Sequence, residues 1–169
     1  MQRRWAVVAV AAMLTVVGAC RDDNDAEGQR PLVDQIQPAI EALESALGGP
    51  QSYFEINATP QLVNLFVADV EQGIVVPYVF AGGDLQEPGP ARGVTGGTPF
   101  VAADVTAELD QVLAGVTAEL PSSDVNVFII YANERGTPQH AATVFSREGG
   151  VLDVELSPTG EVLVVDPRS

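Results

Sequence analysis

The side chains that could do chemistry are few in this chain of 169 residues, because it contains one histidine, one cysteine and no lysine. His140 could act as a general base or a metal ligand, since imidazole titrates near neutral pH. In a strand it would share its side with Ala142, Val144 and Ser146, which favours a structural or surface histidine. No Gly-x-Ser-x-Gly or Ser-x-x-Lys motif supplies a nucleophile, and the spacing of Asp and Glu in the folded part indicates no metal site. We therefore predict no catalytic residue, metal ion or cofactor.

The basic residues of one predicted hairpin form a candidate contact patch. Arg135, His140 and Arg147 lie close in sequence within an acidic chain. Once residues 1–19 are removed, six arginines stand against twenty-three acidic residues, so the net charge is 6 − 23 = −17. Such a charge repels nucleic acid and anionic lipid headgroups. The three basic residues could bind an acidic partner, or they could simply keep the loops soluble.

The only thiol, that of Cys20, lies where an apolar segment ends. Residues 1–4 form a cationic start, and Trp5–Ala19 is an apolar run of about fifteen residues. A membrane span needs roughly twenty apolar residues, whereas the hydrophobic region of a signal peptide is shorter. The run therefore predicts an export signal at residues 1–19.

The last residues of this signal resemble the lipobox of bacterial lipoproteins, with Val17, Gly18 and Ala19 before Cys20. The resemblance implies that the signal is cut between Ala19 and Cys20, and that Cys20 is acylated on its sulfur and usually on its new amino group. Several acyl chains, at about 0.8 kcal/mol per buried methylene, would anchor the protein firmly on the extracytoplasmic side of the cell membrane. The alternatives are a plain secretory signal with an incidental cysteine, although an exposed free thiol is reactive, and a single membrane anchor.

Residues 20–30 form an acidic tether in this interpretation. They contain no apolar side chain larger than that of Ala26 after the cysteine, and such a stretch stays solvated. A calcium-binding loop is the alternative, because five residues match positions 1, 3, 5, 6 and 12 of an EF-hand loop. These residues are Asp23, Asp25, Glu27, Gly28 and Asp34. Glu27 is long for its position, and Asp34 stands where a bidentate glutamate is usual.

The first half of the folded part reads as one helix followed by three strands. Apolar residues from Leu32 to Leu47 recur at intervals of three and four, which predicts a helix. Pro38 either starts this helix or kinks it, and the Gly-Gly-Pro at 48–50 ends it. The predicted strands are Ser52–Ala58, Gln61–Asp69 and Gly73–Phe80. Pro77 lies in the third strand, which should therefore lie at an edge or carry a bulge.

The second half repeats this order. A helical stripe runs from Val105 to Leu120, and four strands are predicted at Val125–Tyr131, Gln139–Ser146, Val151–Leu156 and Glu161–Val165. Thr59-Pro60-Gln61 matches Thr137-Pro138-Gln139 at an offset of 78. Glu71, Gly73 and Gly83 match Glu148, Gly150 and Gly160 at an offset of 77. These sparse matches predict a duplicated unit.

The predicted fold class is α+β, in which two helix-plus-antiparallel-strand units form one antiparallel-sheet domain with the helices packed on it. The first unit covers residues 31–87, and the second covers residues 101–169. A Gly/Pro-rich linker at 88–100 joins them, within the segment Ala81–Pro99 that holds six glycines and three prolines. Such a segment is long for an ordinary connection, and a functional flap is the alternative interpretation.

The segment Leu152–Leu163 resembles the closing hairpin of PepSY-type envelope domains, with the turn sequence Thr159-Gly160-Glu161-Val162. The resemblance covers about twelve residues and implies an analogous hairpin, without bearing on activity.

Together these patterns predict a membrane-anchored envelope lipoprotein whose exposed, non-catalytic domain binds another envelope component, most simply a protein. A carrier with an apolar cavity for a lipid or another apolar ligand is the first alternative. A cell-wall hydrolase is the second, and it would need a cleft that brings polar groups together around His140 or a carboxylate with a shifted pKa.

Overall fold

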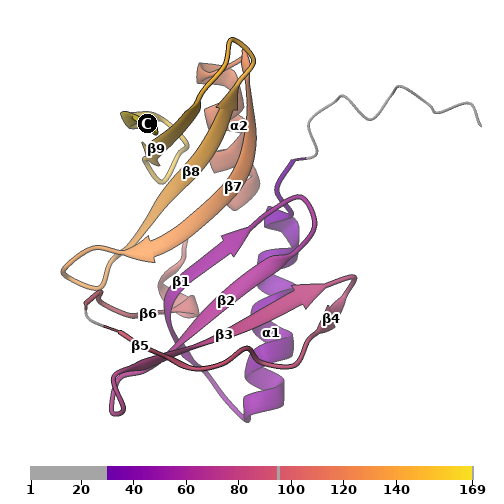
Figure 1. The fold of residues 1–169 in the computed structure, drawn as a ribbon, viewed down its shortest axis with the longest axis vertical. Coiled ribbons are helices and arrows are strands. Elements are labelled where there is room, and N and C mark those ends of the chain that lie inside the picture. The colour runs from indigo at the N-terminus through magenta and orange to yellow at the C-terminus, as the bar shows by residue number, and fades with distance from the viewer. Residues whose placement is uncertain (1–29, 95, 169) are drawn as a thin grey trace, which may run out of the picture.

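The computed structural model of the chain describes residues 30–94 and 96–168, which contain two α-helices and one ten-stranded sheet (Figure 1). The α-helices are α1 (Ile36–Leu47) and α2 (Leu109–Glu119), and 3-10 turns precede them at Val33–Gln35 and Ala102–Asp104. The strands before α2 are β1 (Ser52–Ala58), β2 (Val63–Asp69), β3 (Ile74–Ala81), β4 (Asp84–Leu85), β5 (Arg92–Gly93) and β6 (Phe100–Val101). The strands after α2 are β7 (Ser123–Ala132), β8 (Pro138–Ser146), β9 (Val151–Leu156) and β10 (Val162–Arg168). The signal, Cys20 and the calcium-loop positions 23–28 lie outside the described residues.

The sheet runs in the order β10-β9-β8-β7-β1-β2-β3-β4, and its strand pairs are antiparallel. Two short strands lie off this path, since β5 pairs with β3 and β6 pairs with β1. The two halves of the chain meet where β1 lies beside β7. There Ile56 pairs with Leu65 on one side and with Ile130 on the other. The fold is therefore α+β and consists mostly of antiparallel sheet, as the sequence predicts.

Helix α1 follows the predicted apolar stripe and begins at Ile36, two residues before Pro38. The proline is thus the third helical residue, and it fits because the first backbone N–H groups of a helix have no partner within it. Gly48 ends the helix in the left-handed conformation, with a φ of 85°, and its N–H donates to the carbonyl of Glu44. Glycine adopts this conformation without strain.

Helix α2 meets the turn between β9 and β10 at two glycines. A Cβ atom on Gly160 would lie 2.3 Å from the carbonyl oxygen of Val112, and one on Gly115 would lie 2.8 Å from that of Gly160. Gly160 also has a φ of 86°, in the left-handed region. The backbone of the turn therefore lies directly against the backbone of the helix, an approach that only glycine allows at these positions.

One hydrophobic core joins both halves of the chain. Its buried residues come from α1, from α2 and from alternate positions of the long strands. Leu43 of α1, Val112 of α2, Leu65 of β2 and Ile130 of β7 are all within it and wholly buried. We call the side of the sheet that carries Leu65 and Ile130 the core face.

The opposite side of the sheet, the second face, carries the residues that alternate with the buried ones. Its central members are all partly exposed, and they are Phe54, Glu55, Asn57, Asn64, Phe66, Ile129 and Tyr131. Aromatic and aliphatic side chains are thus common on both sides, although only the core face is fully buried.

The Gly/Pro-rich connection runs along the edge of the sheet. Its backbone N–H groups at Gln86, Gly89 and Val94 donate to carbonyls of Val79, Pro77 and Gly73 in or next to β3. In Figure 1 this segment then crosses the lower ends of the strands towards β6, which pairs with the start of β1. Pro77 lies between the short partners β4 and β5, on the edge side of β3. Strand β3 is not an edge strand, because β4 and β5 pair with it on that side, but Pro77 lies at the point where neither of them does.

Candidate binding pocket

A pocket of about 330 Å³ opens on the second face of the sheet. Its walls are mainly apolar and aromatic, and one carboxylate lines it. The lining residues are Phe54, Glu55, Phe66, Val75, Val94, Gly96, Gly97, Thr98, Tyr131 and Ala132. Concave, mostly apolar sites with few polar groups are typical of ligand pockets, and this volume is at the lower end of their range.

A β-bulge in β1 places the residues at the base of this pocket. The register with β2 shifts between Tyr53 and Glu55, so that Tyr53 is buried on the core face while Phe54 and Glu55 both line the pocket. Glu55 then lies opposite Phe66 on one side and opposite Tyr131 on the other. Side chains opposite each other on neighbouring strands have Cβ atoms about 5 Å apart. A carboxylate therefore stands between two aromatic rings in one row across three strands.

Two asparagines fix the direction of the Glu55 carboxylate. The Nδ2 group of Asn64 donates to Oδ1 of Asn57 at 2.7 Å, and the Nδ2 group of Asn57 donates to Oε1 of Glu55 at 2.6 Å. Asn57 and Asn64 lie directly opposite each other on β1 and β2. This row of hydrogen bonds holds one carboxylate oxygen of Glu55, and the described residues provide no partner for its Oε2.

The charged side chain among the described lining residues, that of Glu55, is negative. Within the described part of the chain, Glu55 forms no ion pair, because the three pairs found there join Arg30 to Asp110, Arg147 to Asp124 and Arg168 to Asp153. Burial and the nearby carboxylate of Glu155 raise the pKa of the Tyr131 phenol. Arg92 of β5 lies opposite Val75 of β3 and is exposed.

The end of the Gly/Pro-rich connection forms one wall of the pocket. A Cβ atom on Gly97, whose φ is 103°, would lie 3.5 Å from the ring of Phe54. A Cβ atom on Gly136, in the turn between β7 and β8, would lie 3.6 Å from the methyl group of Thr98. Two segments that are distant in sequence from β1 thus border the same opening.

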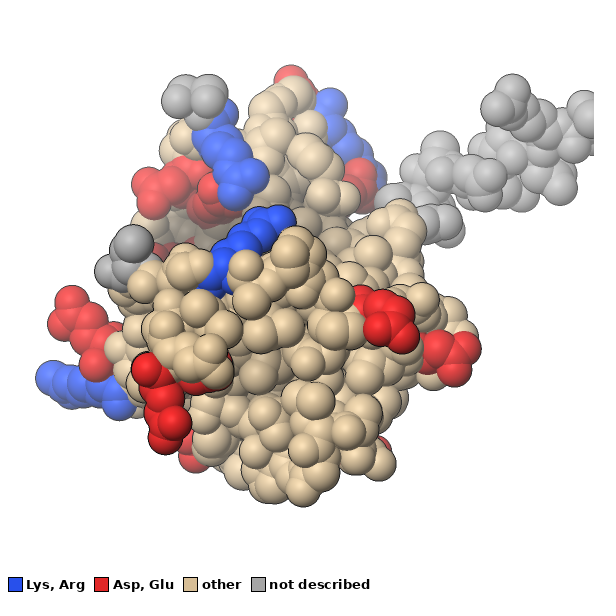
Figure 2. All heavy atoms as spheres, turned by 60° about the horizontal axis from the view of Figure 1, so that its bottom comes forward, with Lys and Arg blue, Asp and Glu red and all other residues tan. Residues whose placement is uncertain are grey.

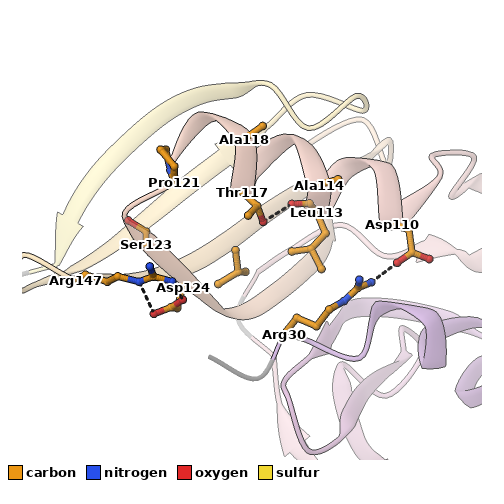
Figure 3. Close-up of a pocket in the computed structure, with 11 residues that line it drawn as sticks. Arg30, Asp110, Leu113, Ala114, Thr117, Ala118, Pro121, Ser123, Asp124 and Arg147 are labelled. Carbon is orange, nitrogen blue, oxygen red and sulfur yellow. Dashed lines mark hydrogen bonds and ion pairs between the residues drawn. The ribbon is translucent and has the colours of Figure 1, made fainter. Parts of the chain in front are cut away.

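A larger hollow of about 550 Å³, the α2 groove, lies between α2 and the start of β7 (Figure 3). Small side chains of α2, including Ala114 and Ala118, line it together with Val125. An ion pair stands at each end, and its charges neutralise each other. Arg30 pairs with Asp110, and Arg147 pairs with Asp124, whose pKa is lowered by the hydrogen bond from the guanidinium. Because the charged groups of this groove are already paired with each other, it provides fewer unpaired charged groups for a polar ligand than the pocket beside Glu55.

The three residues of the predicted basic patch do not come together. Arg135 lies in the turn before β8 and Arg147 lies just after that strand, whose nine residues span about 30 Å. His140 is 4% exposed and faces the core. On the face that Figure 2 shows, the blue arginine side chains are scattered over the surface. The expected patch is therefore not formed, because strand alternation turns His140 inward and the strand separates the arginines.

His140 packs within the core rather than in a cleft. Its ring centroid lies 5.9 Å from that of Phe128, and neither ring nitrogen has a hydrogen-bond partner among the residues that the structure describes. Burial lowers the pKa of this imidazole, since the charged form would lose its hydration. His140 lines neither the pocket nor the α2 groove.

Two other functional features are absent from the described residues, 30–94 and 96–168. No group of three or more His, Cys, Asp or Glu side chains there could hold a metal ion. No helix in this part of the chain has both the length and the apolar character needed to cross a membrane.

Comparisons with known proteins gave no match. The chain matches no protein-family model, no curated protein and no solved structure.

Proposed function

We propose that this protein is a lipid-anchored lipoprotein of the bacterial envelope, and that its folded part is a non-catalytic module that binds another envelope protein. We further propose that the pocket beside Glu55 is the contact site. The observation that carries the proposal is the row Phe66–Glu55–Tyr131, which presents one oriented carboxylate between aromatic walls on the partly exposed face of the sheet.

The anchor rests on the sequence of residues 1–20. Replacing Cys20 with alanine should move the protein from the membrane fraction to the soluble fraction, because the acylated sulfur would be lost. The control is Glu161→Gln, which changes an exposed residue in the turn between β9 and β10 and should leave the protein in the membrane. A Cys20→Ala protein that stays attached to membranes would overturn the anchor.

The contact site can be tested by site-specific crosslinking in the producing cells. A photoreactive residue at Phe66 should form an adduct with an envelope protein, and the same residue at Leu47, which is 44% exposed at the end of α1 on the other side of the sheet, should not. The adduct should disappear when Phe54 is replaced by serine, because this change removes one pocket wall. Equal adducts from both positions, or an adduct insensitive to Phe54→Ser, would contradict the proposed site.

The volume of the pocket favours this function over a lipid carrier. At about 330 Å³ it is at the lower end of the range for small-molecule sites, which suits a side chain better than an acyl chain. The hydrolase alternative depended on His140 or on a carboxylate with a shifted pKa in a cleft. His140 is buried away from both hollows, and the shift at Asp124 has an ordinary cause in its arginine partner.

We also infer that the two halves arose by duplication of one unit, with each helix packed on its own strands. Three observations support this inference: strand order is mirrored about the β1–β7 pair, α1 contacts β1 and β2, and α2 contacts β7. Gly83 and Gly160, which match in sequence, both have a left-handed φ in a turn between the last strands of their half. An experimental structure in which residues 36–81 failed to superpose on residues 109–156 would contradict it.

A further inference from the structure

Among the described residues that line the aromatic pocket, one is charged, and it is the acid Glu55. Glu55 is held by Asn57 through one oxygen, and no arginine in the described residues pairs with it. A carboxylate that is partly withdrawn from water gains most from a ligand that brings a positive charge with hydrogen-bond donors. The pocket therefore has a negatively charged group as well as apolar walls.

The neighbours of Glu55 point to the same chemistry. Rings of Phe54, Phe66 and Tyr131 line the pocket around the carboxylate. The faces of aromatic rings attract cations, and this attraction grows when the cation is desolvated. Aliphatic contacts are available at Val75 and Val94, so a ligand with an apolar stem and a charged end would match both parts of the wall.

The rest of the molecule also favours a cation. Without residues 1–19 its net charge is 6 − 23 = −17, and long-range attraction speeds the association of a basic partner. Of the charged residues near the pocket, Glu155 is acidic and acts on Tyr131. The basic residues Arg92, opposite Val75, and Arg135, in the turn after Ala132, are both exposed and do not line the pocket. An anionic ligand would meet Glu55 directly and is disfavoured.

We propose that the pocket binds the side chain of a lysine or arginine from the partner protein, with the cationic group at Glu55 and the aliphatic stem along the aromatic wall. This inference rests on the proposed function, since it names the group of the partner that enters the proposed contact site. The ammonium or guanidinium group hydrogen-bonds to Oε2 of Glu55, and Oε1 keeps its bond from Asn57.

The test uses the full-length protein in non-ionic detergent, with the amide signals of residues 55, 66 and 131 followed by NMR. The probes are Nα-acetyl-lysine amide, its neutral counterpart Nα-acetyl-norleucine amide, and free butylammonium. The lysine probe should bind about tenfold more tightly than norleucine, which is the usual value of a hydrogen bond to a charged group. In Glu55→Gln the two probes should bind equally, whereas the exposed control Glu161→Gln should behave as the unaltered protein.

The outcomes separate this inference from the proposed function. Equal binding of lysine and norleucine to the unaltered protein would overturn the cation site but leave an apolar contact pocket. Absence of binding by every probe would overturn both. Tighter binding of butylammonium than of the lysine probe would overturn the protein side chain as the source of the cation.

Discussion

Leu65 and Phe66 are neighbours on β2, yet they illustrate how differently the two faces of the sheet are used. Leu65 is wholly buried on the core face, whereas Phe66 is partly exposed beside Glu55 on the second face. The core face gains stability from complete burial and close packing. The second face keeps large apolar groups at the surface beside an oriented carboxylate, an arrangement that suits binding better than stability. The following predictions test this difference.

The largest loss of stability is expected from Gly160→Ala, at the turn that closes the core face against α2. The added Cβ would lie 2.3 Å from the Val112 carbonyl oxygen and would require a left-handed alanine. Together these effects should cost about 4 kcal/mol in the free energy of unfolding. Urea denaturation measures it, with Gly149→Ala as the control, because Gly149 has a φ of 101° but nothing within 4 Å. Equal losses at both glycines would show that backbone strain alone decides the effect.

The next effect compares the two faces directly. Leu65→Ala should lower the free energy of unfolding by about 3 kcal/mol, because it removes buried methylenes and leaves a cavity. Phe66→Ala should cost only about 1 kcal/mol, because a half-exposed ring loses less buried area and leaves no closed cavity. Thermal or urea unfolding of the two variants provides the measurement. If Phe66→Ala were the more costly change, the second face would have to be regarded as a second core.

A smaller effect is expected from the polar row of the second face. Asn57→Ala removes the hydrogen bond to Glu55 and the one from Asn64, and should cost about 1 kcal/mol. Binding of the lysine probe should weaken as well, since the carboxylate would no longer be held in one direction. The matched control is Gln37→Ala, which removes one exposed bond to Glu41 on α1 and should leave probe binding unchanged.

The smallest effect, that of His140→Leu, should depend on pH. Burial holds the pKa of folded His140 below its ordinary value of 6.5, so below this pH the unfolded chain binds a proton that the folded chain does not. The contribution to stability is therefore complete above about pH 6.5 and is lost as the pH falls towards the lowered pKa. The His140→Leu variant does not lose stability in this way, and it leaves no unpaired imidazole in the core. Its free energy of unfolding in urea, relative to that of the unaltered protein, should therefore increase as the pH is lowered from 7 to 5. A constant difference across this range would contradict a buried neutral histidine.

Much of the secondary structure could be predicted because single-sequence patterns report local burial. The strands Ser52–Ala58 and Val151–Leu156 are confirmed at the predicted bounds, since turn residues flank both of them. Helix α2 is shorter than its apolar stripe, beginning at Leu109 rather than near Val105. The two-residue strands β4, β5 and β6 were not predicted, because pairs so short have no period and depend on where β3 and β1 lie.

The pocket could not be predicted from alternation. A strict two-residue period places Phe54 on the same side as Ile56, which is on the core face, but the bulge in β1 turns Phe54 to the second face. The same period correctly places His140 beside Ala142 and Val144, and these neighbours indicate that it is buried. The prediction that Arg135 and Arg147 form a patch was wrong, because residues that are close in sequence lie far apart when an extended strand separates them.

The pairing of β1 with β7 also determines when the fold can close. Ile56 meets Ile130, which lies 74 positions later in the chain, and pairs so distant in sequence form slowly because a long loop must be closed first. A chain exported from its N-terminus would expose β1 as an open edge until β7 emerged. During that interval the first half is the segment most in need of protection from aggregation. The β1–β7 pairing that joins the two halves thus makes the first half vulnerable to aggregation while the chain folds.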